Sequence, residues 1–485
     1  MTDIILFFPS YETTDVRLLP MSVLSVAAPL VQNGYQVKII DQRVDKDWKK
    51  NLLEEIKEKP LAVGISALTG KQILNGIKVS KLVKENSDIP VIWGGVHSSL
   101  MPHQTMENKY IDFVVIGEGE ETFLELVRAL SSKGSSENIK GLGYKKNNKI
   151  FINPPRDFID LDKLPEIPYH LINIENYIEK KSFATGKPAR DIALYTSRGC
   201  PHRCGFCYNK EFNKRRWRGK SAERVVEDMK KLIEDYRVTS FNIEDDEFFV
   251  DIKRVGKICE LILKEGLNIE IFTNCRVNYV ANNMDDNYLK LLYRAGFKTL
   301  AFGVESGSEK ILDLMRKDIT IEQVFETIRK LKKAGINSKY YFMAGFPTET
   351  IDDLYETTDL IYKMKQINPQ IRIPAWRITT PFPGTELYTE SLKHGFIPPK
   401  SLEQWADFSF ETFKTPWISK KQKRIIRNVA FLIDYLQMGG TKGKGIFFQL
   451  AKIFGKLVDW RWKNHYFPWL PEKYIINFIL KIKFF

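Results

Sequence analysis

Three of the five cysteines in this 485-residue chain lie within eight residues of one another. Cys200, Cys204 and Cys207 are spaced C-x3-C-x2-C. Three thiolates at such spacing can ligate three irons of a cubane [4Fe-4S] cluster and leave the fourth iron open to a substrate. The clustering is wrong for a disulfide framework, so the pattern predicts a metal centre in a reducing, cytoplasmic compartment.

A zinc knuckle is the alternative for the same loop. Zinc also takes thiolates at short spacing, and His202 inside the loop could serve as its fourth ligand. A closed zinc site uses ligands in complementary pairs, however, and neither Cys259 nor Cys275 belongs to a second C-x2-C pair. The iron–sulfur interpretation is therefore favoured, and these two cysteines are interpreted as ordinary buried thiols.

The elements that must position this loop begin near Asp191. Six β-rich runs alternate with amphipathic helical stretches from there to about residue 390. This periodicity predicts a partial (β/α)6 barrel of the TIM type, with the cysteine loop after its first strand. Ligand contacts in such barrels gather at the carboxyl ends of the strands.

Polar or flexible residues follow the next four predicted strands. Each one alone could be a helix cap or a surface group, but their joint placement after consecutive strands indicates a site. They are Glu244 and Asp245 after the second strand, Asn274 and Arg276 after the third, Glu305 and Ser306 after the fourth, and Gly345 after the fifth.

The first 140 residues predict a separate α/β domain. Five short apolar runs alternate with helical stretches, which is typical of a doubly wound, flavodoxin-like parallel sheet. Ligands of such sheets bind at the carboxyl ends of the strands. No G-x-G-x-x-G follows the first strand, which disfavours a nicotinamide or flavin dinucleotide.

The composition divides the chain into four parts. Residues 1–140 form the α/β domain, and the proline-rich residues 141–187 predict a hairpin followed by a linker. Residues 188–390 form the barrel, and 391–485 form a basic, aromatic, helical C-terminal region.

The C-x3-C-x2-C loop, with the aromatic Phe206 before its last cysteine, resembles that of the radical S-adenosylmethionine (SAM) superfamily. The resemblance implies that the open iron chelates SAM, and that one electron cleaves SAM to a 5′-deoxyadenosyl radical. It also implies a set of SAM contacts in the cysteine loop and at the strand ends: Phe206, Glu244, Asp245, Asn274, Arg276, Glu305, Ser306 and Gly345.

The order of the domains resembles the cobalamin-binding class of that superfamily. The shared features are Gly94-Gly95-Val96-His97, Gly117-Glu118-Gly119-Glu120, the linker IDLDKLPEIP and the segment PFPGTELY, and the resemblance covers about residues 1–390. It implies a corrinoid held between the sheet and the barrel mouth. The implied contacts are Pro9, Ser10, Ser66, Thr69, Gly94, Gly95, His97, Gly117, Glu118 and Gly119.

The D-x-H-x-x-G signature that supplies a histidine to cobalt is absent. We therefore expect a base-off corrinoid without a histidine ligand. For His97, a role in shaping its loop or touching the cofactor edge is favoured over ligation of cobalt.

The net charge of +14 is concentrated at the C-terminal end. Residues 419–485 carry fourteen Lys or Arg against three acidic residues, interleaved with aromatic residues. Amphipathic helices of this kind can lie on an anionic membrane surface, or can cap the barrel with their apolar face. Nucleic-acid binding is disfavoured because no RNA-binding domain is visible. No signal peptide and no apolar stretch of membrane-spanning length is evident, so we expect a cytoplasmic protein. If the C-terminal helices lie on a membrane surface, the protein would be peripheral to the membrane.

The resemblance implies a cobalamin-dependent radical SAM enzyme that methylates an unactivated carbon of a small or lipid-like substrate, with flavodoxin or ferredoxin as reductant. Anaerobic oxidative cyclisation, or another carbon–carbon bond formation, is the alternative within the family. A non-catalytic corrinoid or iron–sulfur sensor or carrier is the alternative of another class.

Overall fold

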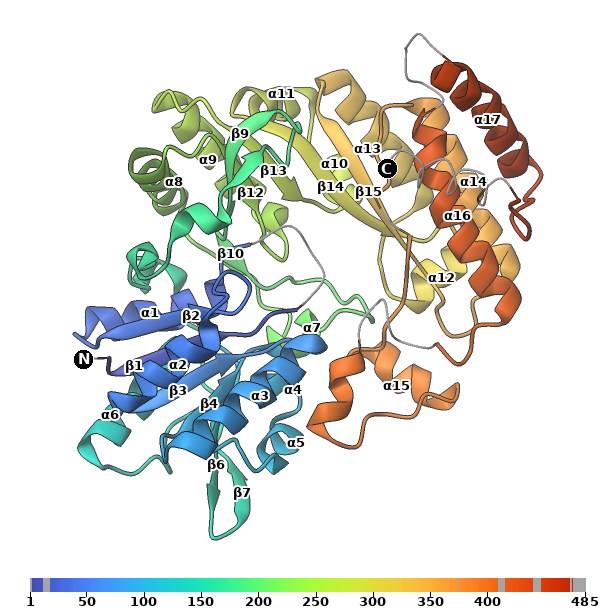
Figure 1. Cartoon of the computed structure of the whole chain (residues 1–485). Helices are drawn as coiled ribbons and strands as arrows, with labels where there is room; N and C mark the ends of the chain where they lie inside the picture. The colour runs from blue at the N-terminus through green and yellow to red at the C-terminus, as the bar shows by residue number, and fades with distance from the viewer. Residues whose placement is uncertain are drawn as a thin grey trace.

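The computed structural model describes residues 2–11, 18–374, 376–408, 415–438, 446–471 and 473. Two seven-stranded sheets carry the fold, one from each half of the chain. In Figure 1 the first sheet lies at the lower left, the second curls above it, and the C-terminal helices cover the right-hand side of the second.

The first sheet is doubly wound. Its five parallel strands have the order β2-β1-β3-β4-β5, with α1 and α6 packed together and α2 beside α3 (Figure 1). Strands β1, β3 and β4 are almost wholly buried because helices cover the sheet. The flavodoxin-like order is the predicted one. The bounds are β1 Ile4–Phe8, β2 Val37–Asp41, β3 Ala62–Ser66, β4 Val91–Gly94, β5 Phe113–Val115, α1 Met21–Gln32, α2 Trp48–Lys57, α3 Lys71–Asn86, α4 Val96–Leu100, α5 Pro102–Glu107 and α6 Glu120–Ser132.

The predicted hairpin extends this sheet. Strands β6 (Leu142–Lys146) and β7 (Lys149–Ile152) are antiparallel, and β6 pairs with β5. Asn147 and Asn148 at its tip both have positive φ, as the tight two-residue turn of a hairpin requires. The chain then reaches the second sheet through short 3-10 turns, which are η1 Leu161–Lys163, η2 Tyr169–Leu171 and η3 Ile174–Tyr177.

The second sheet is the partial barrel. Six parallel strands lie in chain order from β9 to β16, and the short antiparallel β8 is added beside β9. No pairing joins β16 to β8 among the described residues, so the barrel is open, as predicted. The strands are β8 Glu179–Lys181, β9 Pro188–Leu194, β12 Ser240–Ile243, β13 Glu270–Asn274, β14 Phe297–Glu305, β15 Asn337–Ala344 and β16 Trp376–Ile378. The helices are α8 Ala222–Tyr236, α9 Ile252–Lys264, α10 Val277–Asn283, α11 Asp286–Arg294, α12 Glu309–Leu314, α13 Ile321–Ala334 and α14 Ile351–Ile367, and η4 is Phe248–Val250.

The long barrel helices begin at side-chain caps. Ser221, Asp251, Asp285, Thr320 and Thr350 each accept a hydrogen bond from a backbone N–H in the first turn. Such a cap stabilises a helix by about 0.5–2 kcal/mol because it satisfies an orphan donor. These caps fix where each helix starts, and with it the length of the preceding loop at the barrel mouth.

The cysteine loop is closed by a small ribbon of its own. Strand β10 (Ser197–Arg198) pairs with β11 (Arg218–Gly219), and α7 (Asn209–Phe212) lies between them. The cysteines are therefore held on a closed loop at the end of the first barrel strand.

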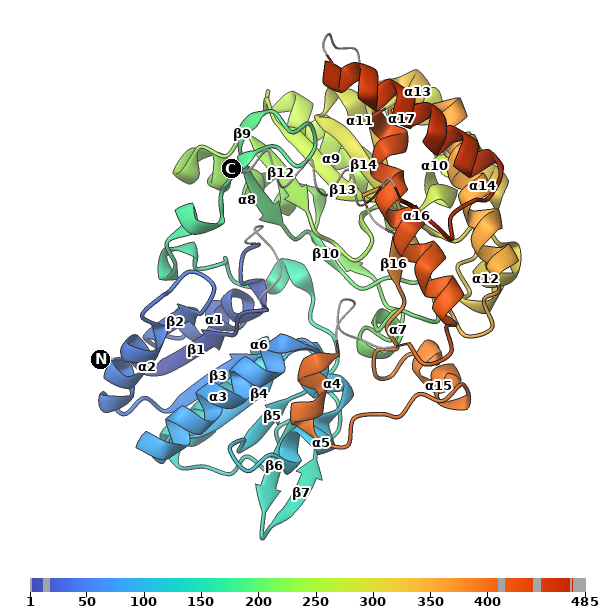
Figure 2. The ribbon, with the colours of Figure 1, turned by 45° about the vertical axis from the view of Figure 1, so that its right-hand side comes forward.

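The C-terminal region touches both halves of the molecule. Helix α15 (Glu386–Lys393) precedes η5 (Leu402–Asp407), which returns to pack on α3 of the first domain, as Figure 2 shows. Helices α16 (Lys420–Met438) and α17 (Ile446–Lys463) pack on α14 of the barrel. Within the described chain no helix is long and apolar enough to cross a membrane. The predicted helical stretch at 473–485 lies outside the described residues except for Lys473.

Candidate active site

A cavity of about 1120 Å³ lies between the strand ends of the first sheet and the mouth of the barrel. It exceeds the ~300–1,000 Å³ of sites for drug-sized ligands, so it has room for a large cofactor. Six residues predicted for a corrinoid line it, namely Ser66, Gly94, Gly95, Gly117, Glu118 and Gly119. From the barrel side come Tyr195, Ser197, Arg198, Tyr208, Glu244 and Asp246.

Two glycines shape the first-sheet wall of this cavity. Gly95 has φ +92°, and a Cβ there would lie 2.8 Å from the carbonyl oxygen of Ala67. Gly117 has φ +80°, and a Cβ there would meet no atom within 4 Å. Because Gly117 borders open space without a side chain, its backbone can be approached closely by a broad, flat ligand. The wall therefore fits a corrinoid.

Four other residues predicted for the corrinoid stand behind the wall. The carbonyl oxygens of Pro9 and Ser10 accept hydrogen bonds from Gln72 Nε2 (2.7 Å) and Asn75 Nδ2 (2.8 Å), which tie the loop after β1 to α3. Thr69 Oγ1 hydrogen-bonds His97 Nδ1 at 2.9 Å. These contacts organise the loops, and the four side chains are not among the cavity-lining residues.

His97 is the most deeply placed of them. It is fully buried, with its ring 5.5 Å from that of Trp405 in η5, and burial lowers its pKa to about 3. Its Nε2 has no hydrogen-bond partner among the described residues. In this structure the neutral imidazole packs against η5 and does not border the cavity.

The backbone of the cysteine loop is anchored to two other segments. Gly205 N donates to the carbonyl oxygen of Met315 (2.8 Å), and Leu387 N donates to the carbonyl oxygen of Gly205 (2.9 Å). Leu387 belongs to the predicted segment PFPGTELY, and Lys210 and Arg316 both pair with the adjacent Glu386. That segment thus fixes the middle of the cysteine loop.

The three thiols have the chemistry of a cluster ligand set. Burial raises the pKa of Cys200 to about 12 and that of Cys207 to about 11, with smaller contributions from the neighbouring thiols. Arg276 Nη1 donates a hydrogen bond to Cys204 Sγ (3.3 Å). A bound cluster would keep all three deprotonated, since coordination removes the thiol proton. The residues therefore fit an iron–sulfur cluster.

His202, the fourth ligand in the zinc alternative, is held by a tyrosine. His202 Nε2 hydrogen-bonds Tyr279 Oη at 3.0 Å, and burial, with the nearby Arg276, lowers its pKa to about 4.

Three residues predicted for SAM surround the cysteines together with a lysine that the sequence analysis missed. Glu305 forms a buried ion pair with Lys317 (2.9 Å), whose Nζ lies 5.6 Å from the centre of the Phe206 ring. Arg276 donates to the carbonyl oxygen of Lys317 as well as to Cys204. These groups place two cations, one carboxylate and an aromatic ring beside the cluster ligands.

The two adjacent carboxylates after β12 do different things. Glu244 lines the cavity, accepts from Asn242 Nδ2 (2.6 Å), and has its pKa raised by burial. Asp245 is buried and accepts from Thr196 N, Thr196 Oγ1 and Ser197 Oγ, each at 2.6 Å. Asp245 thus holds the strand end that leads into the cysteine loop.

The remaining predicted residues belong to loop frameworks. Asn274 ends β13 and is half-buried. Ser306 Oγ is buried against Thr357 Oγ1 (3.2 Å). The Gly345 carbonyl oxygen accepts from Thr379 Oγ1 (2.6 Å) and from Trp417 Nε1 (2.8 Å), so the loop after β15 is tied to the C-terminal region.

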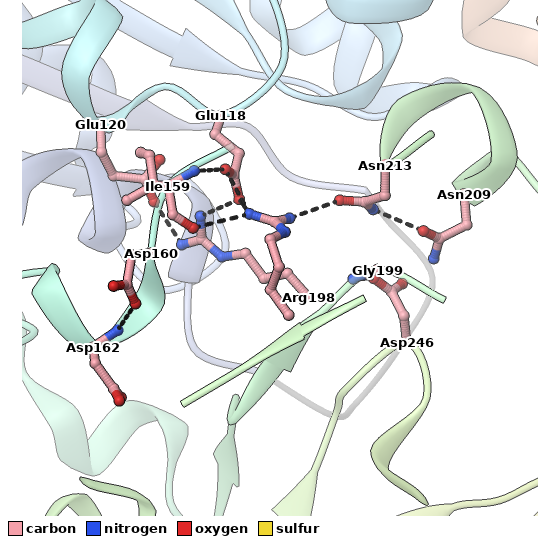
Figure 3. Close-up of polar contacts among 11 residues, drawn as sticks. Glu118, Glu120, Ile159, Asp160, Asp162, Arg198, Gly199, Asn209, Asn213 and Asp246 are labelled. Atoms are coloured by element: carbon pink, nitrogen blue, oxygen red, sulfur yellow. Dashed lines mark hydrogen bonds and ion pairs between the residues drawn. The ribbon is translucent and has the colours of Figure 1, made fainter. Parts of the chain in front are cut away.

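An ion cluster joins the first domain to the cysteine loop (Figure 3). Glu118 Oε1 accepts from Arg198 Nη1 (2.8 Å), and its two oxygens accept from Arg218 Nη1 (2.9 and 2.8 Å). Arg198 Nη2 also donates to Glu120 (2.5 Å), and Ile159 N in the linker donates to Glu118 (3.0 Å). Burial alone would raise the pKa of Glu118, but the two arginines hold it below its ordinary value.

Asp246 completes the fixation of this loop. Its Oδ2 accepts from Gly199 N at 2.8 Å, directly before the first cysteine (Figure 3). The sequence signals for these contacts were present in Gly117–Glu120 and in the arginine of Ser197-Arg198-Gly199-Cys200. Their pairing was not predicted, because the partners lie far apart in the chain.

Comparisons with known proteins bear on both domains. The model of the radical SAM superfamily matches residues 194–361, and that of the B12 binding domain matches residues 12–127. The uncharacterized methyltransferase PH0819 of Pyrococcus horikoshii is 34% identical over 402 residues, covering 81% of this chain and 84% of the relative. The anaerobic magnesium-protoporphyrin IX monomethyl ester cyclase of Rubrivivax gelatinosus is 29% identical over 402 residues, covering 80% and 69%.

Solved structures share the fold. The cobalamin-dependent radical enzyme OxsB, with aqua-cobalamin and S-adenosylmethionine bound, has a TM-score of 0.73 at 18% identity and covers 99% of this chain and 75% of its own. The radical SAM methyltransferase TsrM of Kitasatospora setae, with cobalamin and a [4Fe-4S] cluster bound, has a TM-score of 0.64 at 19% identity and covers 81% and 75%.

A doubly wound domain that faces an open barrel bearing a three-cysteine loop defines the class of cobalamin-binding radical SAM enzymes. The chain belongs to the radical SAM superfamily, in the group that carries an N-terminal B12-binding domain. The predictions of an enzyme and of its cofactors, a [4Fe-4S] cluster, SAM and cobalamin, are thereby confirmed.

Proposed function

We propose that this enzyme transfers a methyl group to an unactivated carbon of a small or lipid-like substrate bound in the interdomain cavity. One observation carries the proposal: the glycine loops of the first sheet and the strand ends of the barrel line the same cavity. A substrate held there would lie between the glycine wall of the first sheet and the barrel residues Ser197 and Arg198, which lead into the cysteine loop. Two curated relatives support methyl transfer by name, PH0819 and the cytidylyl-2-hydroxyethylphosphonate methyltransferase of Streptomyces wedmorensis, the latter 25% identical over 433 residues, covering 79% of each chain.

When bound, the cofactors supply the radical and the methyl group. We assign the cluster to Cys200, Cys204 and Cys207, and SAM to the group formed by Phe206, Arg276 and Glu305. We assign the corrinoid to the glycine wall of the first sheet. We also propose that the chain divides as the sequence predicts, into the α/β domain (1–140), the linker (141–187), the barrel (188–390) and the C-terminal region (391–485).

The protein's own part in this reaction is to position groups and to exclude water. Phe8, Tyr195 and Tyr208 contribute aromatic rings to the cavity wall, which keep a reactive substrate away from solvent. Glu244 borders the cavity, so its carboxyl group can hydrogen-bond a polar group of the substrate.

The test is anaerobic reconstitution of the full chain with iron, sulfide and hydroxocobalamin, followed by EPR, absorbance spectra and a dithionite-driven assay for 5′-deoxyadenosine. We expect cluster signals and SAM cleavage, both lost in Cys200→Ala, Cys204→Ala and Cys207→Ala. Cys259→Ala is the matched control, because Cys259 is fully buried on α9 away from the loop. Bound zinc with no SAM cleavage would refute the proposal.

A second candidate is anaerobic oxidative cyclisation, which is favoured by the similarity to the Rubrivivax gelatinosus cyclase. The two reactions differ in their products, since methylation adds one carbon to the substrate and oxidative cyclisation adds none. Mass spectrometry after incubation with methyl-labelled SAM separates them. A flavodoxin or ferredoxin is the proposed reductant, and faster turnover with either protein than with dithionite would support it.

A further inference from the structure

Helix α17 and the loop that follows it display large apolar side chains to solvent. Trp469 is 62% exposed, Trp460 50%, Tyr466 42% and Leu457 37%. The rings of Trp460 and Tyr466 lie 5.8 Å apart, so helix and loop share one surface. We call these four residues the aromatic patch. Single exposed apolar residues are ordinary, but a cluster of this kind marks a surface that meets a partner.

The loop is fixed in the conformation that exposes these rings. Phe467 and Leu470, which alternate with the exposed residues, are buried, and Asn428 Nδ2 donates to the Phe467 carbonyl oxygen (2.7 Å). The buried Arg461 donates to the carbonyl oxygens of Tyr466 (3.0 Å) and Trp469 (2.9 Å). The exposure of the patch is therefore built into the fold.

Other large apolar side chains among the described residues of this region are buried. On α16 the residues Ile425, Ile426, Val429, Leu432 and Ile433 are buried. Trp462 on α17 is buried too and donates to the Thr358 carbonyl oxygen of α14 (2.7 Å). Packing on the barrel thus explains why one face of these helices is apolar. It does not explain why the aromatic patch is exposed to solvent.

The charge around the patch indicates its partner. Lys456 and Lys463 are exposed and lie four residues before and three residues after Trp460 on the same helical face. Lys463 pairs with the partly exposed Asp459 (2.9 Å). Residues 419–485 as a whole carry a net charge of +11. Indole and phenol rings favour the headgroup level of a bilayer, and nearby lysines are attracted to anionic lipids.

We propose that the aromatic patch, with Lys456 and Lys463, docks this enzyme on an anionic bilayer surface, with α17 lying in the plane of the headgroups. In Figures 1 and 2, α17 lies at the end of the barrel far from the first domain, so docking leaves the interdomain cavity uncovered. The proposal does not depend on which reaction the enzyme performs.

The test is cosedimentation of the full chain with vesicles of phosphatidylcholine alone and with vesicles of equal parts phosphatidylcholine and phosphatidylglycerol. We expect binding to the anionic vesicles only, weakened about tenfold by Trp460→Ser/Trp469→Ser because the buried apolar area is lost. Lys456→Gln/Lys463→Gln should weaken binding at low salt and have little effect at high salt.

Tyr293→Ser is the matched control, because Tyr293 is an aromatic residue 40% exposed on α11 of the barrel. It should bind vesicles as the wild type does. Circular dichroism and SAM cleavage, both unchanged in the tryptophan variant, would exclude misfolding. The proposal is overturned if the wild type ignores anionic vesicles or if the tryptophan variant binds them equally well. Self-association of the wild type that the variant abolishes, without vesicle binding, would make the patch an interface between copies and would equally refute it.

Discussion

At the scale of the residue, Glu305 combines an unusual backbone with a buried charge. Its φ is +72°, a left-handed conformation that a residue with a Cβ adopts only when its surroundings impose it. Its carboxylate and the Lys317 ammonium are less than one-tenth exposed and lie 2.9 Å apart. Each of the two buried charges neutralises the other, since little water reaches them. The ion pair therefore holds the strained end of β14 beside the cysteine loop.

We predict that Glu305→Gln destabilises the protein by about 3–5 kcal/mol, because it leaves the Lys317 ammonium buried without a counter-charge. Urea unfolding of the wild type and the variant measures this. Asp286→Asn is the control, since it breaks the largely exposed pair with Lys333 and should lose about 1 kcal/mol or less. Equal losses in the two variants would show that burial does not govern the pair.

Which residues could be predicted depends on what a local pattern encodes. Spacing identified the three cysteines, and strand periodicity located Glu244, Asp245 and Glu305 at strand ends, because both signals are local. The direction of each side chain was not encoded. Asp245 turns into the hydrogen bonds of Thr196 and Ser197 while its neighbour Glu244 lines the cavity, and only the packed barrel decides between them.

At the scale of the element, α14 illustrates how one helix start organises a strand-end loop. Thr350 and Asp353 form a capping box, and Asp353 also accepts from Lys310 Nζ (2.7 Å) and Ser308 Oγ (2.7 Å). Ser308 follows β14, so the cap of α14 fixes the loop after the fourth barrel strand as well. Burial alone would raise the pKa of Asp353, but these donors lower it to about 2.

A folded-state pKa below the ordinary value of 3.8 means that the charged carboxylate of Asp353 stabilises the fold above that pH. We predict that Asp353→Asn loses about 2 kcal/mol at pH 7. The loss should shrink as the pH falls from about 5 towards 2, because Asp353 of the wild type becomes about half protonated at its pKa of about 2. Urea midpoints at a series of pH values measure it. Asp352→Asn, an exposed first-turn neighbour, is the control and should change little at any pH.

The order of the elements was largely predictable and their long-range contacts were not. Runs of alternating strands and helices identified both sheets, since parallel strands require crossover helices. The return of η5 to α3 has no local signal, because Trp405 and His97 meet across some three hundred residues of chain. The pairing of β6 with β5 makes the hairpin part of the first sheet. This pairing also depends on tertiary packing and could not be predicted from a local pattern.

At the scale of the whole molecule, several contacts hold the first domain against the barrel, its linker and the C-terminal region. They include the ion cluster around Glu118, the hydrogen bond from Tyr177 Oη to Asp41 (2.8 Å), and the packing of η5 on α3. The ion cluster reaches the cysteine loop through Arg198 and Arg218 on β10 and β11, and α4 of the first domain also packs on α7 of that loop. It therefore couples the wall of the cavity to the position of the cluster ligands.

We predict that Glu118→Gln loosens this coupling. The Glu118 side chain is 6% exposed and faces two arginines, so neutralising it leaves their charges partly uncompensated and should weaken the contact between domains by about 3–5 kcal/mol. Hydrogen exchange should then rise in the linker around Ile159 and in β10 and β11, while the core of the first sheet stays protected. Glu121→Gln is the matched control, because Glu121 lies only three residues further along the chain, in the first turn of α6. It pairs with Arg156, but its side chain is 54% exposed. Faster exchange in both variants, or in neither, would mean that the ion cluster does not hold the two halves together.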